Sequence, residues 1–161
     1  MSLKKYEQKR KFNKTLEPSS ASSRNKFSSK GKIKFSNKKT IFVIHKHHAS
    51  HLHWDLRLEI NDVLKSWAVP KEPPRTKVEK RLAIQVEDHP LSYATFKGTI
   101  PEGNYGAGKV EIWDNGIYKL IEKTNKKIEF ELKGKKMKGN YVLIKTNYGN
   151  KPEKSWLWMK I

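Results

Sequence analysis

Short apolar runs with a period of two residues dominate the chain from Thr40 onward. Such alternation places the apolar side chains on one face of a β-strand, whereas no segment shows the 3.6-residue stripe of an amphipathic helix. The runs span residues 40–45, 54–60, 63–69, 81–88, 109–114, 117–123, 127–134, 140–146 and 155–161. We expect an all-β fold. A compact closed or nearly closed β-barrel of about eight or nine strands would leave the fewest strand edges with unpaired backbone N–H and C=O groups.

Two polar motifs separate neighbouring runs and predict tight hairpin turns. Asn61 and Asp62 lie between the second and third runs, and an Asp-Asn-Gly motif at 114–116 lies between the fifth and sixth. Residues of these types tolerate the positive φ angles of hairpin turns. Farther along the same region, Gly106 and Gly108 predict positive φ or a close backbone approach. This glycine-rich segment lacks the Gly-Lys-Ser/Thr ending of a phosphate-binding P-loop, which excludes that motif.

Composition divides the chain into a basic N-terminal segment (1–39) and a barrel (40–161). The 161 residues, of which 35% are hydrophobic, suit one ordinary domain with an extension. Residues 1–40 hold 13 Lys and Arg against two acids. The Ser- and Lys-rich stretch 19–32 predicts a flexible linker. Residues 5–18 either form a solvated basic tail, which their composition favours, or dock on the barrel.

The charge balance favours a polyanionic partner. The chain has 35 Lys and Arg against 16 Asp and Glu, a net charge of +19, and it has no cysteine. Either nucleic acid or an acidic membrane surface relieves such an excess, and the missing cysteines exclude disulfides, thiolate metal sites and cysteine nucleophiles. No run has the length of a membrane-spanning helix or the character of a signal peptide. We therefore expect a cytoplasmic, nucleoid-associated monomer that does not bind membranes.

A histidine cluster precedes the second predicted strand. Five of the six histidines fall within nine residues: His45, His47, His48, His51 and His53. Strand alternation then places a polar row on one face, opposite the apolar residues 54, 56, 58 and 60. This row consists of His53, Asp55, Arg57 and Glu59.

Two imidazoles and a carboxylate from this region suit Mn²⁺, Zn²⁺ or Fe²⁺. We expect His47 to be the second imidazole beside His53 and Asp55, since His48 and His51 fall in the turn. Arg57 could hold a phosphate oxygen beside the metal through its fork of donors. The alternative is a solvated strand face with an Asp–Arg pair.

A second polar row occurs in residues 81–89. Alternation places Leu82, Ile84 and Val86 on one face of this strand. Its other face carries Arg81, Gln85, Glu87 and His89, and Tyr93 follows in the connection. The row either lines the same cavity as the histidine cluster or forms the polar outer face of a half-buried strand.

Long ungapped motifs resemble a known family. They are HKHHASHLHWDLRLEINDVLKSWAVPKEP and RLAIQVEDHPLSYATFKGTIPEGNYGAGKVEIWDNGIY, with WLWMKI at the C-terminus and, more faintly, KRKFNKTLEP at the N-terminus. Together they are similar to the 3′-phosphoesterase module of DNA ligase D and cover essentially the whole chain. No ligase or polymerase segment is visible, so we expect the free-standing form of that module.

The resemblance implies a compact β-barrel enzyme that depends on Mn²⁺, with Co²⁺ or Zn²⁺ as other options. Its substrate would be a DNA primer–template with a 3′-ribonucleotide or 3′-phosphate end, and its partners a separate ligase and polymerase of end joining. A phosphodiesterase step would remove the terminal ribonucleoside. A phosphomonoesterase step would then leave a 3′-hydroxyl.

The resemblance also implies roles for individual residues. It implies His47, His53 and Asp55 as metal ligands, and Arg57 and His89 at the scissile phosphate. Further active-site positions that it implies are Tyr93, Lys71, Arg81, Glu87, Ser66, Arg10 and Glu17. Two residues depart from the family, since Lys11 replaces a common Asp and His45 a common Gln. These two departures could alter the edge of the site and the balance between the phosphodiesterase and phosphomonoesterase steps.

Two other functions fit parts of the pattern. A non-haem Fe(II) oxygenase could use His53, Asp55 and His89 as its two histidines and one carboxylate. A basic barrel that only binds nucleic acid could use its aromatic residues to stack bases. The first leaves the net charge of +19 unexplained. The second leaves the row of His53, Asp55 and Arg57 without a role.

Overall fold

A computed structural model describes residues 3–10, 17–18 and 39–161. The predicted linker and Lys11 lie outside these residues. The N-terminal helix is α1 (Lys4–Gln8), and the strands that follow are β1 (Thr40–His48), β2 (Leu52–Ile60), β3 (Val63–Val69), β4 (Lys80–His89), β5 (Gly98–Ile100), β6 (Gly108–Lys123), β7 (Lys127–Lys133), β8 (Lys138–Lys145) and β9 (Ser155–Lys160). Two short 3₁₀ helices, η1 (Leu91–Thr95) and η2 (Pro152–Lys154), complete the fold.

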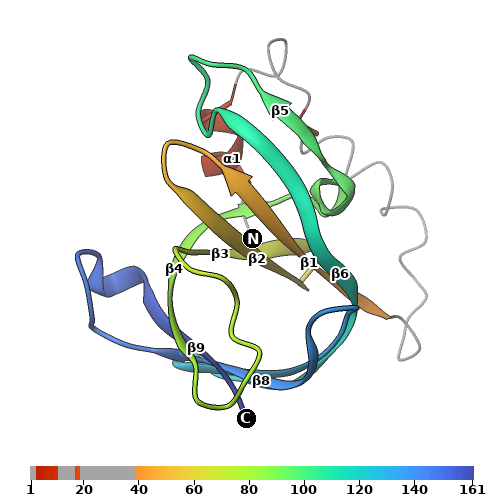
Figure 1. Ribbon diagram of the computed structural model, residues 1–161, viewed down its shortest axis with the longest axis vertical. Helices are drawn as coiled ribbons and strands as arrows, with labels where there is room; N and C mark the ends of the chain where they lie inside the picture. The colour runs from red at the N-terminus through yellow and green to blue at the C-terminus, as the bar shows by residue number, and fades with distance from the viewer. Residues whose placement is uncertain (1–2, 11–16, 19–38) are drawn as a thin grey trace.

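The strands form a closed antiparallel barrel. Their order is β1-β2-β3-β4-β9-β8-β7-β6-β5, and pairing of β1 with β6 closes the sheet (Figure 1). The barrel therefore has eight strands, while β5 pairs with the first residues of β6. This arrangement confirms the predicted all-β barrel. Among the described residues, no helix is long and apolar enough to cross a membrane.

One of the two predicted hairpin turns is confirmed and the other is wrong. Asn61 and Asp62 have φ angles of 54° and 67° and join β2 to β3. By contrast, β6 continues from Gly108 to Lys123 through the Asp-Asn-Gly motif. The buried Asp114 carboxylate instead accepts hydrogen bonds from three backbone N–H groups in the β7–β8 connection, those of Lys135, Lys136 and Met137. A contact distant in sequence thus replaces the local turn.

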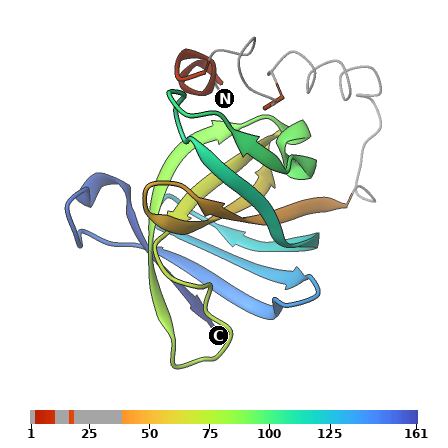
Figure 2. The same cartoon turned by 45° about the horizontal axis from the view of Figure 1, so that its top comes forward.

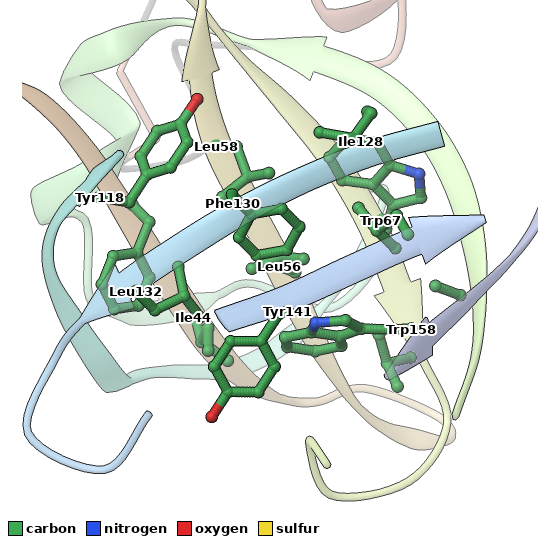
Figure 3. Packing of buried hydrophobic residues seen from close by; sticks show 14 of the residues in the cluster. Ile44, Leu56, Leu58, Trp67, Tyr118, Ile128, Phe130, Leu132, Tyr141 and Trp158 are labelled. Atoms are coloured by element: carbon green, nitrogen blue, oxygen red, sulfur yellow. The ribbon is translucent and has the colours of Figure 1, made fainter. Parts of the chain in front are cut away.

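The interior of the barrel is apolar. Side chains from all eight barrel strands pack there, and most are large, including Leu56, Trp67, Phe130 and Trp158 (Figure 3), whereas β4 contributes Ala83. On β2 the even-numbered residues 54 to 60 point into this core, as alternation predicts. The polar row on the odd-numbered positions therefore lies on the outer face of the sheet.

A second apolar cluster covers part of that outer face. It combines Val43 of β1 and Leu64 of β3 with residues of η1, β5 and α1. Tyr6 of α1 is fully buried in it, and its hydroxyl donates to the Pro18 carbonyl. Residues 3–10 and 17–18 are therefore docked on the barrel, so the solvated-tail interpretation is wrong for this part of the segment. The division at residue 39 stays a prediction.

The pairing of β4 with β3 is irregular. Leu64 lies opposite His89 and Ser66 lies opposite Val86, so the register shifts between these pairs. Such a shift re-aims side chains locally. Val86, Glu87 and His89 all line one cavity, whereas Ala83 points into the barrel core. The predicted apolar face of Leu82, Ile84 and Val86 is only half-buried.

Candidate active site

Three side chains on β1 and β2 have the mutual spacing of metal ligands. His47 pairs directly with His53 across the two strands, and Asp55 follows two residues later on β2. One ligand atom from each residue lies within 4.8 Å of the others. Nε2 of His53 is 3.3 Å from Oδ1 of Asp55, and Nδ1 of His47 is 3.8 Å from Oδ2. This is the set of ligands predicted from the sequence.

Backbone carbonyls orient both imidazoles for this role. Nε2 of His47 lies 2.7 Å from the Gly106 carbonyl oxygen, and Nδ1 of His53 lies 3.0 Å from that of His51. Because a carbonyl only accepts, each of these nitrogens carries the proton. The unprotonated nitrogens, Nδ1 of His47 and Nε2 of His53, are left facing Asp55. Two imidazole lone pairs and a carboxylate fit a divalent transition metal.

The Asp55 carboxylate is ionised despite its burial. Burial by itself would raise the pKa of this carboxyl, but the charge of Arg57 holds the pKa well below its usual range. At neutral pH the Asp55 carboxylate therefore provides an anionic oxygen ligand between the two imidazoles.

Arg57 is held rigidly beside this group of ligands. Its guanidinium donates to Oδ2 of Asp55 at 3.3 Å, to Oγ of Ser66 at 3.0 Å and to Nδ1 of His45 at 3.1 Å. It also lies 4.9 Å from the centre of the Tyr93 ring. These contacts place a buried cation next to the ligands, where it can bind an anion together with the metal.

His45 fixes the orientation of Arg57, a role that the sequence analysis missed. Nε2 of His45 donates to the Phe96 carbonyl oxygen at 3.0 Å, while Nδ1 accepts from Arg57. Burial and the charge of Arg57 lower the pKa of His45 to about 3, so the ring is neutral. Alternation along β1 does place His45 on the same face as His47, and this signal could have revealed the role.

His89 contacts Arg57, with its Nδ1 3.2 Å from Nη1 of that residue. Its Nδ1 is 3.0 Å from the Glu87 carbonyl oxygen, and its Nε2 is 3.3 Å from Nη2 of Arg10. Burial and the charges of Arg57 and Arg10 depress the pKa of His89 well below its ordinary value. Within the described part of the chain, the close ligand group contains His47 rather than His89. The oxygenase arrangement therefore loses its third ligand.

The docked N-terminal segment completes the site. Arg10 pairs with Glu17 at 2.9 Å and with Glu87 at 3.1 Å. The Tyr93 hydroxyl donates to Glu17 at 2.7 Å, and burial raises the pKa of Tyr93 well above its usual range. Lys9, which the sequence analysis did not single out, also pairs with Glu87 at 3.0 Å. A short basic segment thus lies against the polar end of β4.

These residues surround a cavity of about 260 Å³. The predicted site residues that line it are Arg10, Glu17, His47, His53, Asp55, Arg57, Glu87, His89 and Tyr93. Ser66 is buried behind Arg57. Two others do not line the cavity: Lys71 is exposed, and Arg81 donates to the Glu72 carbonyl oxygen and pairs with Glu79. Their predicted roles stay predictions.

Comparison with known proteins matches the chain to one family. A family model described as the DNA Ligase D 3′-phosphoesterase domain matches residues 45–145. The multifunctional non-homologous end joining protein LigD of Pseudomonas aeruginosa is 43% identical over 163 residues, which cover 98% of this chain and 18% of that protein. The multifunctional non-homologous end joining DNA repair protein LigD of Mycobacterium tuberculosis is 51% identical over 111 residues, 66% of this chain and 14% of that protein.

The matched region contains the proposed metal ligands together with Arg57, His89 and Tyr93. The chain spans less than a fifth of the length of these relatives. The family model covers well over half of the chain, and the Pseudomonas relative aligns with nearly all of it. On these grounds the chain belongs to the DNA ligase D 3′-phosphoesterase domain family.

Proposed function

We propose that the protein is a Mn²⁺-dependent phosphoesterase that processes 3′ ends of DNA for repair by end joining. The observation that carries the proposal is the direct contact between Asp55 and Arg57 at 3.3 Å. It joins a metal-ligand group to a buried guanidinium, so one phosphate can contact both. A protein that only bound nucleic acid would need neither the ligand group nor its oriented imidazoles.

The charges that line the cavity suit a metal ion and a phosphate bound together. Two cations (Arg10 and Arg57) face three carboxylates, those of Asp55, Glu17 and Glu87, which leaves one net negative charge. A divalent cation alone would change this net charge to one positive. A phosphodiester monoanion that enters with the metal restores neutrality, which favours their joint binding.

The proposed reaction has two hydrolytic steps. In the first, water adds to phosphorus, and the bond to the 5′-oxygen of a terminal ribonucleoside breaks, so that the nucleoside leaves with a hydroxyl and the strand keeps a 3′-phosphate. In the second, water cleaves this phosphate from the 3′-oxygen, giving inorganic phosphate and a 3′-hydroxyl. When bound by His47, His53 and Asp55, the metal supplies Lewis-acid polarisation of a phosphate oxygen and an activated water.

The surrounding side chains have distinct roles in these steps. Arg57, oriented by His45, holds the equatorial oxygens and stabilises the charge that develops on them. His89, neutral in the free protein, contacts the same phosphate as a hydrogen-bonding partner. Tyr93 stays protonated, and its hydroxyl is the candidate donor to the leaving oxygen. A ligase and a polymerase of end joining would use the resulting 3′-hydroxyl.

A direct test uses a 5′-labelled primer–template whose primer ends in one ribonucleotide, incubated with the protein and Mn²⁺. We expect a 3′-phosphate product first and a 3′-hydroxyl product later, each distinguished by its gel mobility and by extension with a polymerase. The matched control is the same primer ending in a deoxynucleotide. A ribonucleotide primer that stays unchanged in Mn²⁺, Co²⁺ and Zn²⁺ would contradict the proposed function.

A further inference from the structure

A second, larger cavity adjoins the candidate active site along β4. Its volume is about 660 Å³, against about 260 Å³ for the site cavity. Both cavities are lined by Val86, Glu87 and Tyr105. A nucleic-acid strand that extends from the site cavity past these three residues therefore enters the larger cavity directly. This larger cavity is called the groove.

Lysines dominate the lining of this groove. They are Lys4, Lys5, Lys9, Lys151 and Lys154, all of them exposed. The two carboxylates in the lining are already paired: Glu87 with Lys9 and Arg10, and Asp88 with Lys65 at 3.1 Å. The groove therefore has an excess of positive charge that faces solvent.

Both walls of the groove are held in place. One wall is α1, which is anchored by the fully buried Tyr6. The other is the loop around η2, where the Lys145 ammonium donates to the Glu153 carbonyl oxygen at 2.6 Å and the Ser155 hydroxyl donates to that of Lys151 at 2.8 Å. The red helix α1 and the blue η2 loop both lie beside β4 (Figures 1 and 2). The fold thus brings together lysines from opposite ends of the sequence.

We propose that this groove binds the sugar–phosphate backbone of the nucleic-acid strand whose 3′ end enters the site cavity. The inference rests on the proposed function, since that function makes the end of a strand the substrate. Lysine ammonium groups bind phosphates as point charges and do not read bases. Recognition by backbone alone suits an enzyme that must accept 3′ ends of any sequence.

The test compares two variants with the same change of charge. The groove variant is K151E/K154E, which alters the η2 wall and leaves the candidate active site intact. The control variant is K135E/K138E. These two lysines lie at or just before the first residue of β8, whereas the η2 loop contacts its last residue, Lys145. Lys138 lies seven residues along β8 from Lys145, about 23 Å by strand rise. Thermal unfolding of both variants verifies that they fold.

Three substrates separate the possible outcomes: a mononucleoside 3′-phosphate, a single strand of about ten nucleotides that ends in a 3′-phosphate, and the same strand annealed to a template. For the groove variant we expect kcat/KM to fall about tenfold on both strand substrates and to stay unchanged on the mononucleotide. The slope of log KM against the logarithm of the salt concentration should decrease by about one to two, because about two phosphate contacts are lost. The control variant should behave like the natural protein.

Several results would overturn the groove assignment. They are an equal loss on all three substrates, an equal loss in the control variant, no loss on the strand substrates, or a loss confined to the annealed substrate. The last result would place the template strand, rather than the 3′-ended strand, in the groove. Each of these leaves phosphate hydrolysis by the natural protein intact. If the natural protein hydrolyses none of the three substrates, the proposed function itself fails.

Discussion

The Arg57 guanidinium donates to the Asp55 carboxylate across 3.3 Å, from the same face of β2. Asp55 is 5% exposed and Arg57 4%, so water screens this ion pair little. One strand therefore sets the separation between a proposed metal ligand and the proposed phosphate-binding cation. Because removing one partner of a buried pair leaves the other uncompensated, substitution at either position also affects its neighbour.

Replacing Arg57 or His89 by alanine should separate phosphate binding from metal binding. Neither side chain belongs to the ligand group, and removing Arg57 takes away a charge that repels a cation. We expect kcat to fall by a factor of about 10² to 10³ in each variant. Calorimetric Mn²⁺ affinity should stay within about tenfold of that of the natural protein. If His89→Ala loses Mn²⁺ binding, His89 is a ligand and the oxygenase-like arrangement regains support.

Asp55→Asn should abolish both metal binding and hydrolysis. The amide keeps the shape of the side chain but removes the anionic donor between the two imidazoles. Primer–template binding should survive, since backbone electrostatics supply most of the affinity. Mn²⁺-titrated cleavage and calorimetry measure the two losses separately.

The other clustered histidines provide the control for this variant. His48 and His51 are exposed and lie outside the ligand group. His48→Ala and His51→Ala should each cost less than about tenfold in rate, or roughly 1.4 kcal/mol in the barrier. An inactive His51→Ala beside an active His47→Ala would show that the ligand assignment is wrong.

Strand alternation was sufficient to predict which side chains of β2 face the core and which face the cavity. On β2 it placed Trp54 and Leu56 in the core and His53, Asp55 and Arg57 on the opposite face, as the structure has them. It succeeded because β2 pairs with β1 and β3 without any shift of register. A period-two pattern predicts faces correctly wherever the ladder is regular.

Contacts distant in sequence explain what alternation could not predict. The shift of register between β3 and β4 redirects Val86 and Glu87, and no local pattern signals it. Asp114 looked like a turn residue because it begins an Asp-Asn-Gly motif, but its carboxylate accepts from backbone N–H groups of the β7–β8 connection. Arg10, which follows α1, donates to Glu87, 77 residues away along the chain. Such partners become visible only in the folded chain.

Removing residues 1–32 should leave the barrel folded but impair catalysis. The deletion takes away Arg10 and Glu17, which contact His89 and Tyr93 in the site. We expect turnover to fall by at least about tenfold and duplex binding to become less dependent on salt. Arg10→Ala in the full chain separates the two effects, because it should lower turnover while most of the basic charge remains. Turnover, affinity and salt slope that all stay unchanged after the deletion would show that this segment is inert.

The metal-free protein should lose stability as the pH falls below about 6.5, the ordinary pKa of histidine. Burial and the charge of Arg57 lower the pKa of His45 to about 3, and burial with the charges of Arg57 and Arg10 lowers that of His89. Below about 6.5, and down to the lowered pKa of each residue, the unfolded chain binds a proton there and the folded protein does not. The contribution of these two histidines to the free energy of unfolding is therefore fully present above pH 6.5 and declines below it, by on the order of 1 kcal/mol per pH unit for each histidine. His45→Gln keeps a donor for Phe96 and an acceptor for Arg57 but cannot titrate, so its slope should be smaller by about one proton. Urea unfolding in a chelator between about pH 5 and 6.5 measures this slope. His48→Gln, which changes an exposed ring, should leave it unaltered, and an equal slope in His45→Gln and the natural protein would contradict the assignment of a buried neutral His45.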